Sequence, residues 1–308
     1  MTDIVAETAQ AIKDMRVRGA GRIARAGASA MGAFAEGYKG VSIEQFRNDA
    51  GAAAKTILAS RPTAVSLRNG VLYSVRGLDG ASTLKEAVDS VVRDSAEFVE
   101  SSSHAVERIA EVGAQTVRDG DVILTHCNSN AAVGVIKRAN AEKKNIKVYA
   151  TETRPWRQGL ITSRELAEAG VDVTLIVDGA VRSVMGKVDR VFVGADTVAS
   201  DGSLYNKVGT SQIALAANEL GKEFSVCTET YKFSPLTLRG EPVIIEERGR
   251  EEVASESDVP PSVKVFNPVF DRTPAKYISS YITENGIIHP GAVFGEMLRL
   301  FGTGRSKE

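Results

Sequence analysis

The spacing of apolar residues divides the chain into two regions with different periods. From residue 1 to about residue 118, apolar side chains recur every three or four positions, which is the pattern of amphipathic helices. Ser42 and Thr83 each begin a Ser/Thr-x-x-Glu/Gln capping box, in which side chains satisfy the free N–H groups at the start of a helix. No segment of this region is typical of a strand. The predicted helices cover residues 4–15, 23–37, 43–59 and 84–109.

From about residue 119, short apolar runs alternate with helical segments. Strands that are apolar on both faces and alternate with helices indicate a parallel sheet with helices on both sides. The sequence therefore predicts an α/β chain, with a helical N-terminal domain over 1–118 and a doubly wound parallel-sheet domain over 119–308. Segment 235–268 carries more charge and proline and fits neither pattern. The predicted strands are Val122–Leu124, Val148–Ala150, Val173–Val177, Val191–Val193 and Phe224–Cys227, and the predicted helices cover 131–143, 160–169 and 210–221.

Composition and charge argue against a nucleic-acid-binding, disulfide-rich or membrane protein. The 38 basic and 39 acidic residues give a net charge of −1, without the basic excess with which nucleic-acid-binding proteins neutralise phosphates. Two cysteines, Cys127 and Cys227, cannot form a disulfide framework, so a reducing compartment is expected. The first residues carry acids where a signal peptide carries basic residues, and no apolar run reaches the ~18 residues of a membrane helix. We expect a cytoplasmic protein that binds neither nucleic acid nor membrane.

The ends of the predicted strands are the place where ligand chemistry is expected. In an open α/β sheet, ligands bind beyond the carboxyl ends of the strands, where the strand order reverses. The glycine pattern G-x-G-x-x-G is missing after the first strand, which argues against a dinucleotide cofactor. No His/Cys/Asp grouping has the spacing of a zinc site, so neither a cofactor nor a metal is expected. The polar segments that leave the strands are 125–130, 151–154, 178–179, 194–197 and 228–230.

Two residues at these strand ends have side chains suited to proton transfer. Cys127 follows the first strand and precedes a predicted helix, whose N–H groups favour a thiolate that acts as a base or nucleophile. Asp196 follows the fourth strand after two small residues, so its carboxylate can approach a ligand closely. The alternatives are a small buried side chain for Cys127 and a turn-capping carboxylate for Asp196. Cys227 lies inside an apolar run and is predicted to belong to the core.

Basic residues at helix boundaries indicate a phosphorylated ligand. Arg18-Gly19-Ala20-Gly21 joins two predicted helices, where glycines admit close approach and the next helix offers free N–H groups to an anion. Arg61 lies at another such boundary, directly before Pro62. Together with Lys207 and Lys232, these side chains match a small phosphorylated metabolite. A solvated or ion-paired surface role is the alternative for each arginine.

Six short motifs stand in a characteristic order along the chain. They are Arg18–Gly21, Ser60–Val65, Thr125–Asn128, Thr153–Gly159, Gly194–Asp196 and Asn206–Thr210. In these motifs the chain resembles the sugar-phosphate isomerases related to the regulatory subunits of the eukaryotic translation-initiation nucleotide exchanger. Within that group it is most similar to the archaeal ribose-1,5-bisphosphate isomerases, over nearly the whole chain. The resemblance implies a Rossmann-like C-terminal domain after the helical one, and a homo-oligomer built from dimers, in archaeal enzymes a homohexamer (a trimer of dimers).

The resemblance also assigns roles to single residues. Cys127 and Asp196 take the catalytic roles in the isomerisation of ribose 1,5-bisphosphate to ribulose 1,5-bisphosphate. The reaction would pass through an enol phosphate and belong to nucleoside monophosphate (AMP) degradation. AMP as an activator is a further implication, and no motif identifies its site. The residues that the resemblance places at the substrate are Arg18, Gly19, Ala20, Gly21, Arg61, Gln158, Asn206, Lys207 and Lys232.

Two departures from related sequences favour one member of the family. Methylthioribose-1-phosphate isomerases usually have proline after Arg-Gly-Ala, whereas this chain has Gly21 followed by Arg22, which adds a charge where a second phosphate could be held. The regulatory subunits generally lack the Cys/Asp pair that is present here. Both departures favour the bisphosphate isomerase. A methylthioribose-1-phosphate isomerase and a non-catalytic regulatory subunit are the alternatives.

Overall fold

The structure is a computed structural model that describes residues 3–17 and 19–302. The chain divides into two compact units, Met1–His104 and Ala105–Glu308, and helix α5 (Leu84–Ala114) begins in the first and ends in the second. The domain boundary near residue 118 stays a prediction, because compactness does not by itself show which part folds alone. Among the described residues, no helix combines the length and the apolar character needed to cross a membrane.

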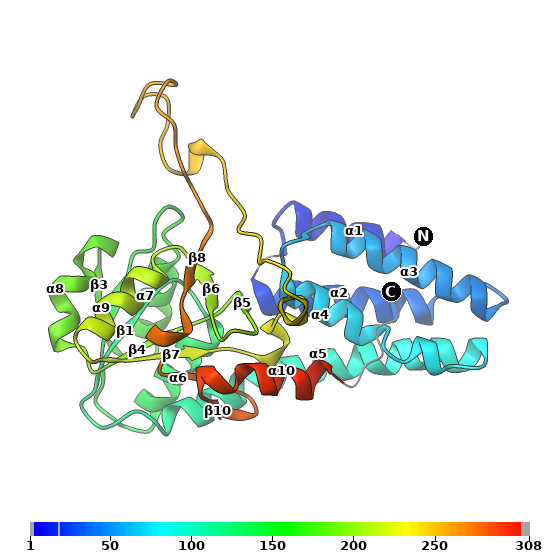
Figure 1. The fold of residues 1–308 in the computed structure, drawn as a ribbon, viewed down its shortest axis with the longest axis horizontal. Helices are drawn as coiled ribbons and strands as arrows, with labels where there is room; N and C mark the ends of the chain where they lie inside the picture. The colour runs from blue at the N-terminus through cyan, green and yellow to red at the C-terminus, as the bar shows by residue number, and fades with distance from the viewer. Residues whose placement is uncertain (1–2, 18, 303–308) are drawn as a thin grey trace. The chain divides into compact units, whose positions relative to one another are not determined.

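The first unit is helical, as its apolar spacing predicts, and its described residues form no strand (Figure 1). The sequence does not predict α4 (Val65–Ser74), because the buried face of this helix includes the polar residues Ser66, Asn69 and Ser74. A short 3-10 turn, η1 (Leu78–Gly80), lies between α4 and α5. The four predicted helices correspond to α1 (Asp3–Lys13), α2 (Ala20–Glu36), α3 (Ile43–Ala59) and α5.

Side-chain caps set the starts of α3 and α5. The Ser42 hydroxyl accepts a hydrogen bond from the N–H of Gln45 at 3.2 Å. The Thr83 hydroxyl accepts from the N–H of Glu86 at 3.2 Å, and the Glu86 carboxylate accepts from the N–H of Thr83 at 3.2 Å. The reciprocal pair confirms the capping box at Thr83, and Ser42 caps α3 as predicted. A cap of this kind stabilises a helix by about 1 kcal/mol.

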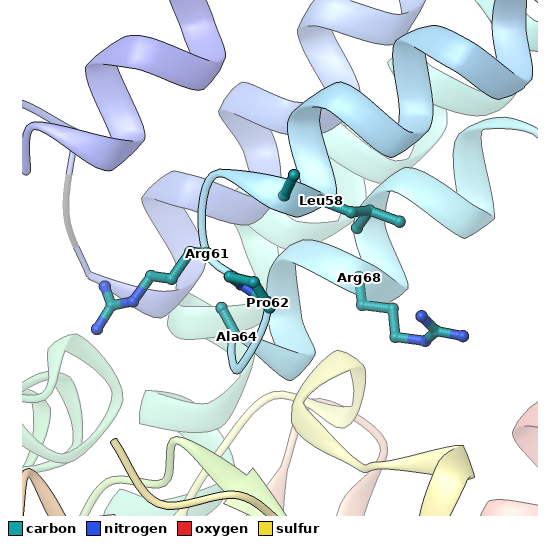
Figure 2. A pocket seen from close by; sticks show the side chains of 6 residues that line it. Leu58, Arg61, Pro62, Ala64 and Arg68 are labelled. Carbon is teal, nitrogen blue, oxygen red and sulfur yellow. The ribbon is translucent and has the colours of Figure 1, made fainter. Parts of the chain in front are cut away.

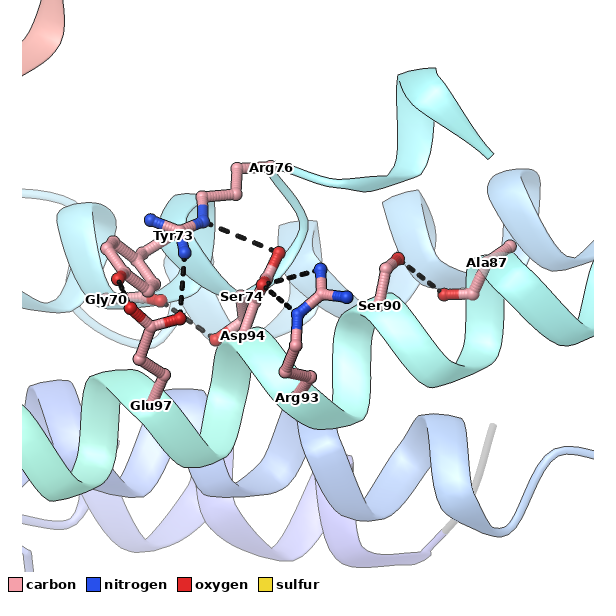
Figure 3. Close-up of polar contacts among 9 residues, drawn as sticks. All are labelled: Gly70, Tyr73, Ser74, Arg76, Ala87, Ser90, Arg93, Asp94 and Glu97. Carbon is pink, nitrogen blue, oxygen red and sulfur yellow. Dashed lines mark hydrogen bonds and ion pairs between the residues drawn. The ribbon is translucent and has the colours of Figure 1, made fainter. Parts of the chain in front are cut away.

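A buried carboxylate joins the end of α4 to α5 (Figure 3). Asp94 is 1% exposed and accepts two hydrogen bonds from Arg93 at 3.0 and 3.1 Å. Its second oxygen lies 3.5 Å from Nε of Arg76, whose guanidinium stacks over the ring of Tyr73 at 3.7 Å and pairs with Glu97 at 2.9 Å. Because an unpaired buried carboxylate costs several kcal/mol, the two guanidinium groups are what makes this burial tolerable.

The second unit contains a seven-stranded sheet in the order β10-β9-β7-β4-β1-β2-β3. All neighbouring strands are parallel except β9 and β10, which pair as an antiparallel edge. The predicted α/β fold with a mostly parallel sheet is therefore confirmed. The strands are β1 (Val122–Thr125), β2 (Lys147–Thr151), β3 (Asp172–Ile176), β4 (Arg190–Val193), β7 (Glu223–Cys227), β9 (Ser280–Thr283) and β10 (Gly286–Ile288).

Helical segments follow β1, β2 and β3, and the core lies against the sheet. Ile123 and Leu124 of β1, Phe192 of β4 and Phe224 of β7 are at most 1% exposed. Three helices match the predicted segments, whereas the short α8 and the C-terminal α10 are not predicted. The helices are α6 (Asn130–Ala141), α7 (Gly159–Glu168), α8 (Val181–Val184), α9 (Thr210–Glu219) and α10 (Val293–Phe301).

Strand β3 departs from the burial that its composition predicts. Leu175 is 43% exposed, and Val177, directly after the strand, is 59% exposed. β3 lies at the edge of the sheet, with β2 as its neighbour. The central strands β1 and β4 have neighbours on both sides and are buried as predicted. The prediction that all strands are covered on both faces is therefore wrong for β3, because an edge position leaves part of an apolar strand open.

A second, antiparallel sheet of three strands has the order β5-β6-β8. Its strands are β5 (Thr197–Val198), β6 (Leu204–Lys207) and β8 (Phe270–Thr273). Before β8, residues 241–268 form a long excursion, coloured yellow to orange in Figure 1, that the sequence did not assign. The guanidinium of Arg250 organises this excursion by donating to the carbonyl oxygens of Val263 at 2.6 Å and Pro260 at 3.1 Å.

Candidate functional site

The strand order of the seven-stranded sheet reverses between β1 and β4. From β1 the chain continues to β2 and β3 on one side, and then returns to form β4 on the other side. Ligands of open α/β sheets bind at such a reversal, beyond the carboxyl ends of the strands. Cys127 follows the end of β1 by two residues, and Asp196 follows the end of β4 by three. The two residues predicted to transfer protons therefore leave the two strands that flank the reversal.

Hydrogen bonds from the end of β2 and from α7 fix the backbone of Cys127. Its φ of 66° lies in the left-handed region that non-glycine residues rarely adopt. Its N–H donates to Oγ1 of Thr153 at 2.9 Å, and its carbonyl accepts from the Thr162 hydroxyl at 2.7 Å. Thr153 follows β2, itself has a φ of 63°, and donates its N–H to Asp178 beyond β3 at 2.8 Å. Backbone strain that the surroundings hold in place is common at functional sites.

The surroundings of Cys127 correct the expectation of a thiolate. Burial raises the pKa of this thiol to about 12. The N–H of Asn128 at the approach to α6 lowers the pKa, as predicted, and so does the ammonium of Lys207, whereas Asp196 raises it. Desolvation is the largest of these effects, because it disfavours the charged form of the thiol. The thiol is therefore protonated at neutral pH in this structure.

A close approach brings the start of α6 against the end of β4. The Ser129 hydroxyl caps α6 by accepting from the N–H of Ala132 at 3.3 Å. A Cβ at Gly194 would lie 2.5 Å from Oγ of Ser129, so this position requires glycine. Two residues later, the partly buried Asp196 donates its N–H to the carbonyl of Tyr205 in β6 at 3.1 Å. The Gly194–Asp196 motif therefore contacts the start of α6 through Gly194 and bonds to β6 through Asp196.

Asn206 and Lys207, at the end of β6, are buried polar residues. They are 5% and 7% exposed, and Nδ2 of Asn206 donates to the Thr210 hydroxyl at 3.0 Å. Burial lowers the pKa of Lys207, while Cys127 and Asp196 raise it. Since Lys207 and Asp196 both act in turn on the thiol of Cys127, the three side chains form one electrostatically coupled group. The structure therefore brings together these three predicted site residues.

Gln158 and Lys232 have different surroundings. Gln158 precedes α7, and its Oε1 is buried with no hydrogen-bond partner among the residues that the structure describes. Nζ of Lys232 lies 2.7 Å from the carboxylate of Glu229, and the two residues are 6% and 4% exposed. Gln158 thus keeps an acceptor for a ligand, whereas the charge of Lys232 is already paired with a residue that the sequence analysis did not single out.

In the first unit, two helix starts come together. The hydroxyl of Ser66 in α4 donates to the carbonyl of Ala20 at the start of α2, at 3.0 Å. Gly19, with a φ of 90°, precedes α2, and Ala64 precedes α4; within the described residues, neither start has a side-chain cap. The motif from Gly19 to Gly21 therefore lies beside the start of α4. Arg18, the first residue of that motif, lies outside the described residues.

Arg61 precedes α4 and lines a cavity of about 220 Å³ (Figure 2). Its carbonyl accepts the N–H of Ala64 at 3.1 Å, which forms a turn before the helix. Figure 2 shows the side chains of Arg61 and Arg68 extending to opposite sides of this cavity. The other lining residues are Leu58, Ala59, Pro62 and Ala64, so the wall between the two arginines is largely apolar.

Arg248 is a cation near Lys207 that the sequence did not identify as a site residue. Arg248, on the excursion before β8, lies over the ring of Trp156 at 5.1 Å from the centroid and pairs with Glu246 at 2.9 Å. Its charge lowers the pKa of Lys207. No sequence signal separates Arg248 from Arg250, because both stand among glutamates.

In the described part of the chain, no group of three or more His, Cys, Asp or Glu side chains could hold a metal ion.

Comparison with known proteins finds relatives over almost the full length. A family model described as "Initiation factor 2 subunit family" matches residues 16–290. The chain is 48% identical over 300 residues to the "Ribose 1,5-bisphosphate isomerase" of Methanocaldococcus jannaschii, which covers 97% of this chain and 96% of that protein. It is 49% identical over 286 residues to the protein of the same name from Archaeoglobus fulgidus, covering 93% and 90%. A crystal structure of the Pyrococcus horikoshii OT3 translation initiation factor eIF-2B superimposes with a TM-score of 0.80 at 31% identity, covering 94% of this chain and 98% of that one.

Proposed function

The chain belongs to the Initiation factor 2 subunit family, and we propose on that basis that it is a sugar-phosphate isomerase that converts ribose 1,5-bisphosphate to ribulose 1,5-bisphosphate. The observation that carries the proposal is the placement of Cys127 and Asp196 after the two strands that flank the reversal of strand order. The reaction belongs to nucleoside monophosphate degradation. Two free cysteines suit a reducing compartment, so the cytoplasm is the proposed location.

The difficulty of this reaction is the phosphate on C1, which prevents the sugar ring from opening as a free hemiacetal would. Asp196 in its acid form donates a proton to the ring oxygen while the bond from C1 to that oxygen breaks. The Cys127 thiolate removes the proton from C2, and the electron pair of that bond forms the C1=C2 double bond of an enol phosphate. Cys127 then returns the proton to C1, and the Asp196 carboxylate accepts the proton of the C2 hydroxyl as the ketone forms. Both residues end in the states in which they began.

The mechanism needs one proton on the pair, and it needs that proton on Asp196 at the start. Burial raises the pKa of Cys127, so the proton rests on sulfur in this structure. Moving this proton from the sulfur to the carboxylate of Asp196 leaves the net charge of the pair unchanged. Because Asp196 raises the pKa of Cys127, the two groups titrate as a coupled unit. Lys207 lowers the pKa of Cys127 and so favours the thiolate form.

The phosphate groups of the substrate need several positive partners. In the first unit, the motif from Gly19 to Gly21 before α2 and Arg61 before α4 are the proposed phosphate contacts, on the family resemblance and because a helix start favours an anion. In the second unit, Lys207 supplies charge, and Oε1 of Gln158, which has no hydrogen-bond partner in the described part of the chain, can accept from a sugar hydroxyl. The contribution of Lys232 stays a prediction, because Glu229 holds its ammonium.

Two further proposals rest on the family resemblance. We propose that the chain assembles into a homohexamer built from dimers, and that AMP activates it. Light scattering of the purified protein tests the first, since a monomer or a lone dimer would contradict it. Initial rates with and without AMP test the second, and equal rates would contradict it.

The deciding experiment compares two substrates on the purified chain. Turnover of ribose 1,5-bisphosphate and of 5-methylthioribose 1-phosphate is followed by NMR of the products. We expect kcat/KM to favour the bisphosphate by at least about 10²-fold, because the charged second phosphate gains hydrogen bonds that a methylthio group cannot make. A preference for the methylthio sugar would overturn the proposal. A folded protein that turns over neither sugar, and binds a partner only with ligand, would instead be a regulatory subunit.

A further inference from the structure

His126 precedes Cys127 and is buried, although the proposed reaction assigns it no role. It is 1% exposed, and its two ring nitrogens have different partners. Nε2 lies 2.9 Å from the carbonyl oxygen of Val208, and Nδ1 lies 2.6 Å from the Thr151 hydroxyl. Because a carbonyl can only accept, Nε2 carries the hydrogen. Burial lowers the pKa of His126, so the ring is neutral and Nδ1 accepts from Thr151.

Polar contacts continue from Thr151 to the backbone of Cys127. Oγ1 of Thr151 lies 3.2 Å from Oγ1 of Thr153, which in turn accepts from the N–H of Cys127 at 2.9 Å. His126 and both threonines are at most 1% exposed, so water does not compete for these contacts. An unbroken chain of hydrogen bonds therefore runs from the carbonyl of Val208 to the amide of Cys127.

The two ends of this chain lie beside two members of the coupled group. Val208 directly follows Lys207, and His126 directly precedes Cys127. Gly209 closes over the imidazole, since a Cβ at this position would lie 3.0 Å from Cε1 of His126 and its φ is 105°. The ring is thus held between the end of β1 and the turn before α9, and it fixes how far apart these two backbones lie.

We propose that His126, as the neutral tautomer with hydrogen on Nε2, is a positioning residue that sets Cys127 and Lys207 relative to each other for proton transfer. The inference rests on the proposed isomerase function, because that function gives Cys127 its role. His126 acts through Thr151, Thr153 and Val208, and none of its ring atoms is needed at the substrate. The charged groups that act on the ring are Asp178, which raises its pKa, and Lys207, which lowers it.

A matched pair of variants tests the positioning role. Thr151→Val and Thr273→Val each remove a fully buried threonine hydroxyl. The hydroxyl of Thr151 bonds to His126, whereas that of Thr273 has no hydrogen-bond partner among the described residues. We expect Thr151→Val to lower kcat by about 10²-fold with little change in KM, as misplacement by about 1 Å does. Thr151→Ser keeps the hydroxyl and should recover most of kcat, and Thr273→Val should match the wild type.

An unaffected Thr151→Val variant, or equal losses in both valine variants, would overturn the inference. The tautomer has its own test, which needs no activity. In ¹⁵N-histidine spectra of the full chain, assigned with His126→Gln, His126 should show hydrogen on Nε2 alone from about pH 6 to 8. An imidazolium or an Nδ1–H signal in that range would also overturn the inference. No turnover by the wild-type chain would overturn the proposed function, whereas wild-type turnover with an unaffected Thr151→Val overturns only the positioning role.

Discussion

The ammonium of Lys232 lies 2.7 Å from the carboxylate of Glu229, in an ion pair whose side chains are 8% and 5% exposed. The Tyr231 hydroxyl donates to the same carboxylate at 3.0 Å. Burial alone would raise the pKa of Glu229, but the nearby ammonium and the hydrogen bonds outweigh it, and the net pKa is lowered. Lys232, predicted as a substrate contact, therefore also balances a buried charge, and its replacement has a consequence for folding.

Lys232→Met should destabilise the folded chain by about 3–5 kcal/mol, because it leaves the Glu229 carboxylate buried without its partner. The double variant Lys232→Met/Glu229→Gln should recover most of this loss, since neither charge is then buried. Unfolding in denaturant of the wild type, both single variants and the double variant measures the effect as a double-mutant cycle. A steep rise in KM with no loss of stability would show instead that Lys232 acts mainly on the substrate.

The same pair predicts a pH dependence of stability. The folded-state pKa of Glu229 lies below its ordinary value, so its contribution is fully present above that ordinary value and is lost as the pH falls through the folded pKa. The difference in unfolding free energy between the wild type and Glu229→Gln should therefore shrink in acid. Denaturant titrations between about pH 7 and pH 3 measure it, and a constant difference would contradict the pairing.

Parts of the fold that carry their own pattern could be predicted, and parts that depend on distant partners could not. The run Val122–Leu124 is apolar and marks β1 by itself. Strand β6 is not marked in this way, because it is stabilised by pairing with β8, in which Phe270 stands opposite Lys207. The same limit holds at the site. Polar residues after strands identified Cys127, but its protonated state depends on burial by the whole fold, which the amide of the next helix does not outweigh.

Cys127→Ser and Asp196→Asn should each lower turnover by at least about 10²-fold, because each removes a proton-transfer group. Substrate binding, measured by calorimetry, should change little, since neither group is needed to hold the phosphates. Cys227→Ala is the matched control, because Cys227 is fully buried in β7 and should leave turnover near the wild-type rate. Near-wild-type turnover by Cys127→Ser would exclude the proton transfer proposed for that thiol.

The charged side chains near Cys127 should determine how fast its thiol is alkylated. The wild-type rate of alkylation by iodoacetamide should still be rising tenfold per pH unit between about pH 7 and pH 10, because only the thiolate reacts and its pKa is about 12. Asp196→Asn should speed alkylation, since the carboxylate raises this pKa, and Lys207→Met should slow it, since the ammonium lowers it. Cys127→Ser reports any reaction at Cys227, whose pKa burial also raises. A wild-type plateau below pH 9 would contradict the protonated thiol.

Arg61→Ala should raise KM by about 10- to 100-fold with a smaller change in kcat, because a charge-assisted bond to phosphate contributes roughly 1.5–3 kcal/mol to binding. Arg68→Ala is the matched control, since Arg68 lines the same cavity but its guanidinium extends to the opposite side (Figure 2). Arg61→Lys separates charge from geometry: a point charge retains part of the affinity, whereas bidentate binding needs the planar fork of arginine. Initial rates over a range of ribose 1,5-bisphosphate concentrations measure all three. An equal rise in KM for Arg61→Ala and Arg68→Ala would place the effect in the shape of the cavity and not in a phosphate contact.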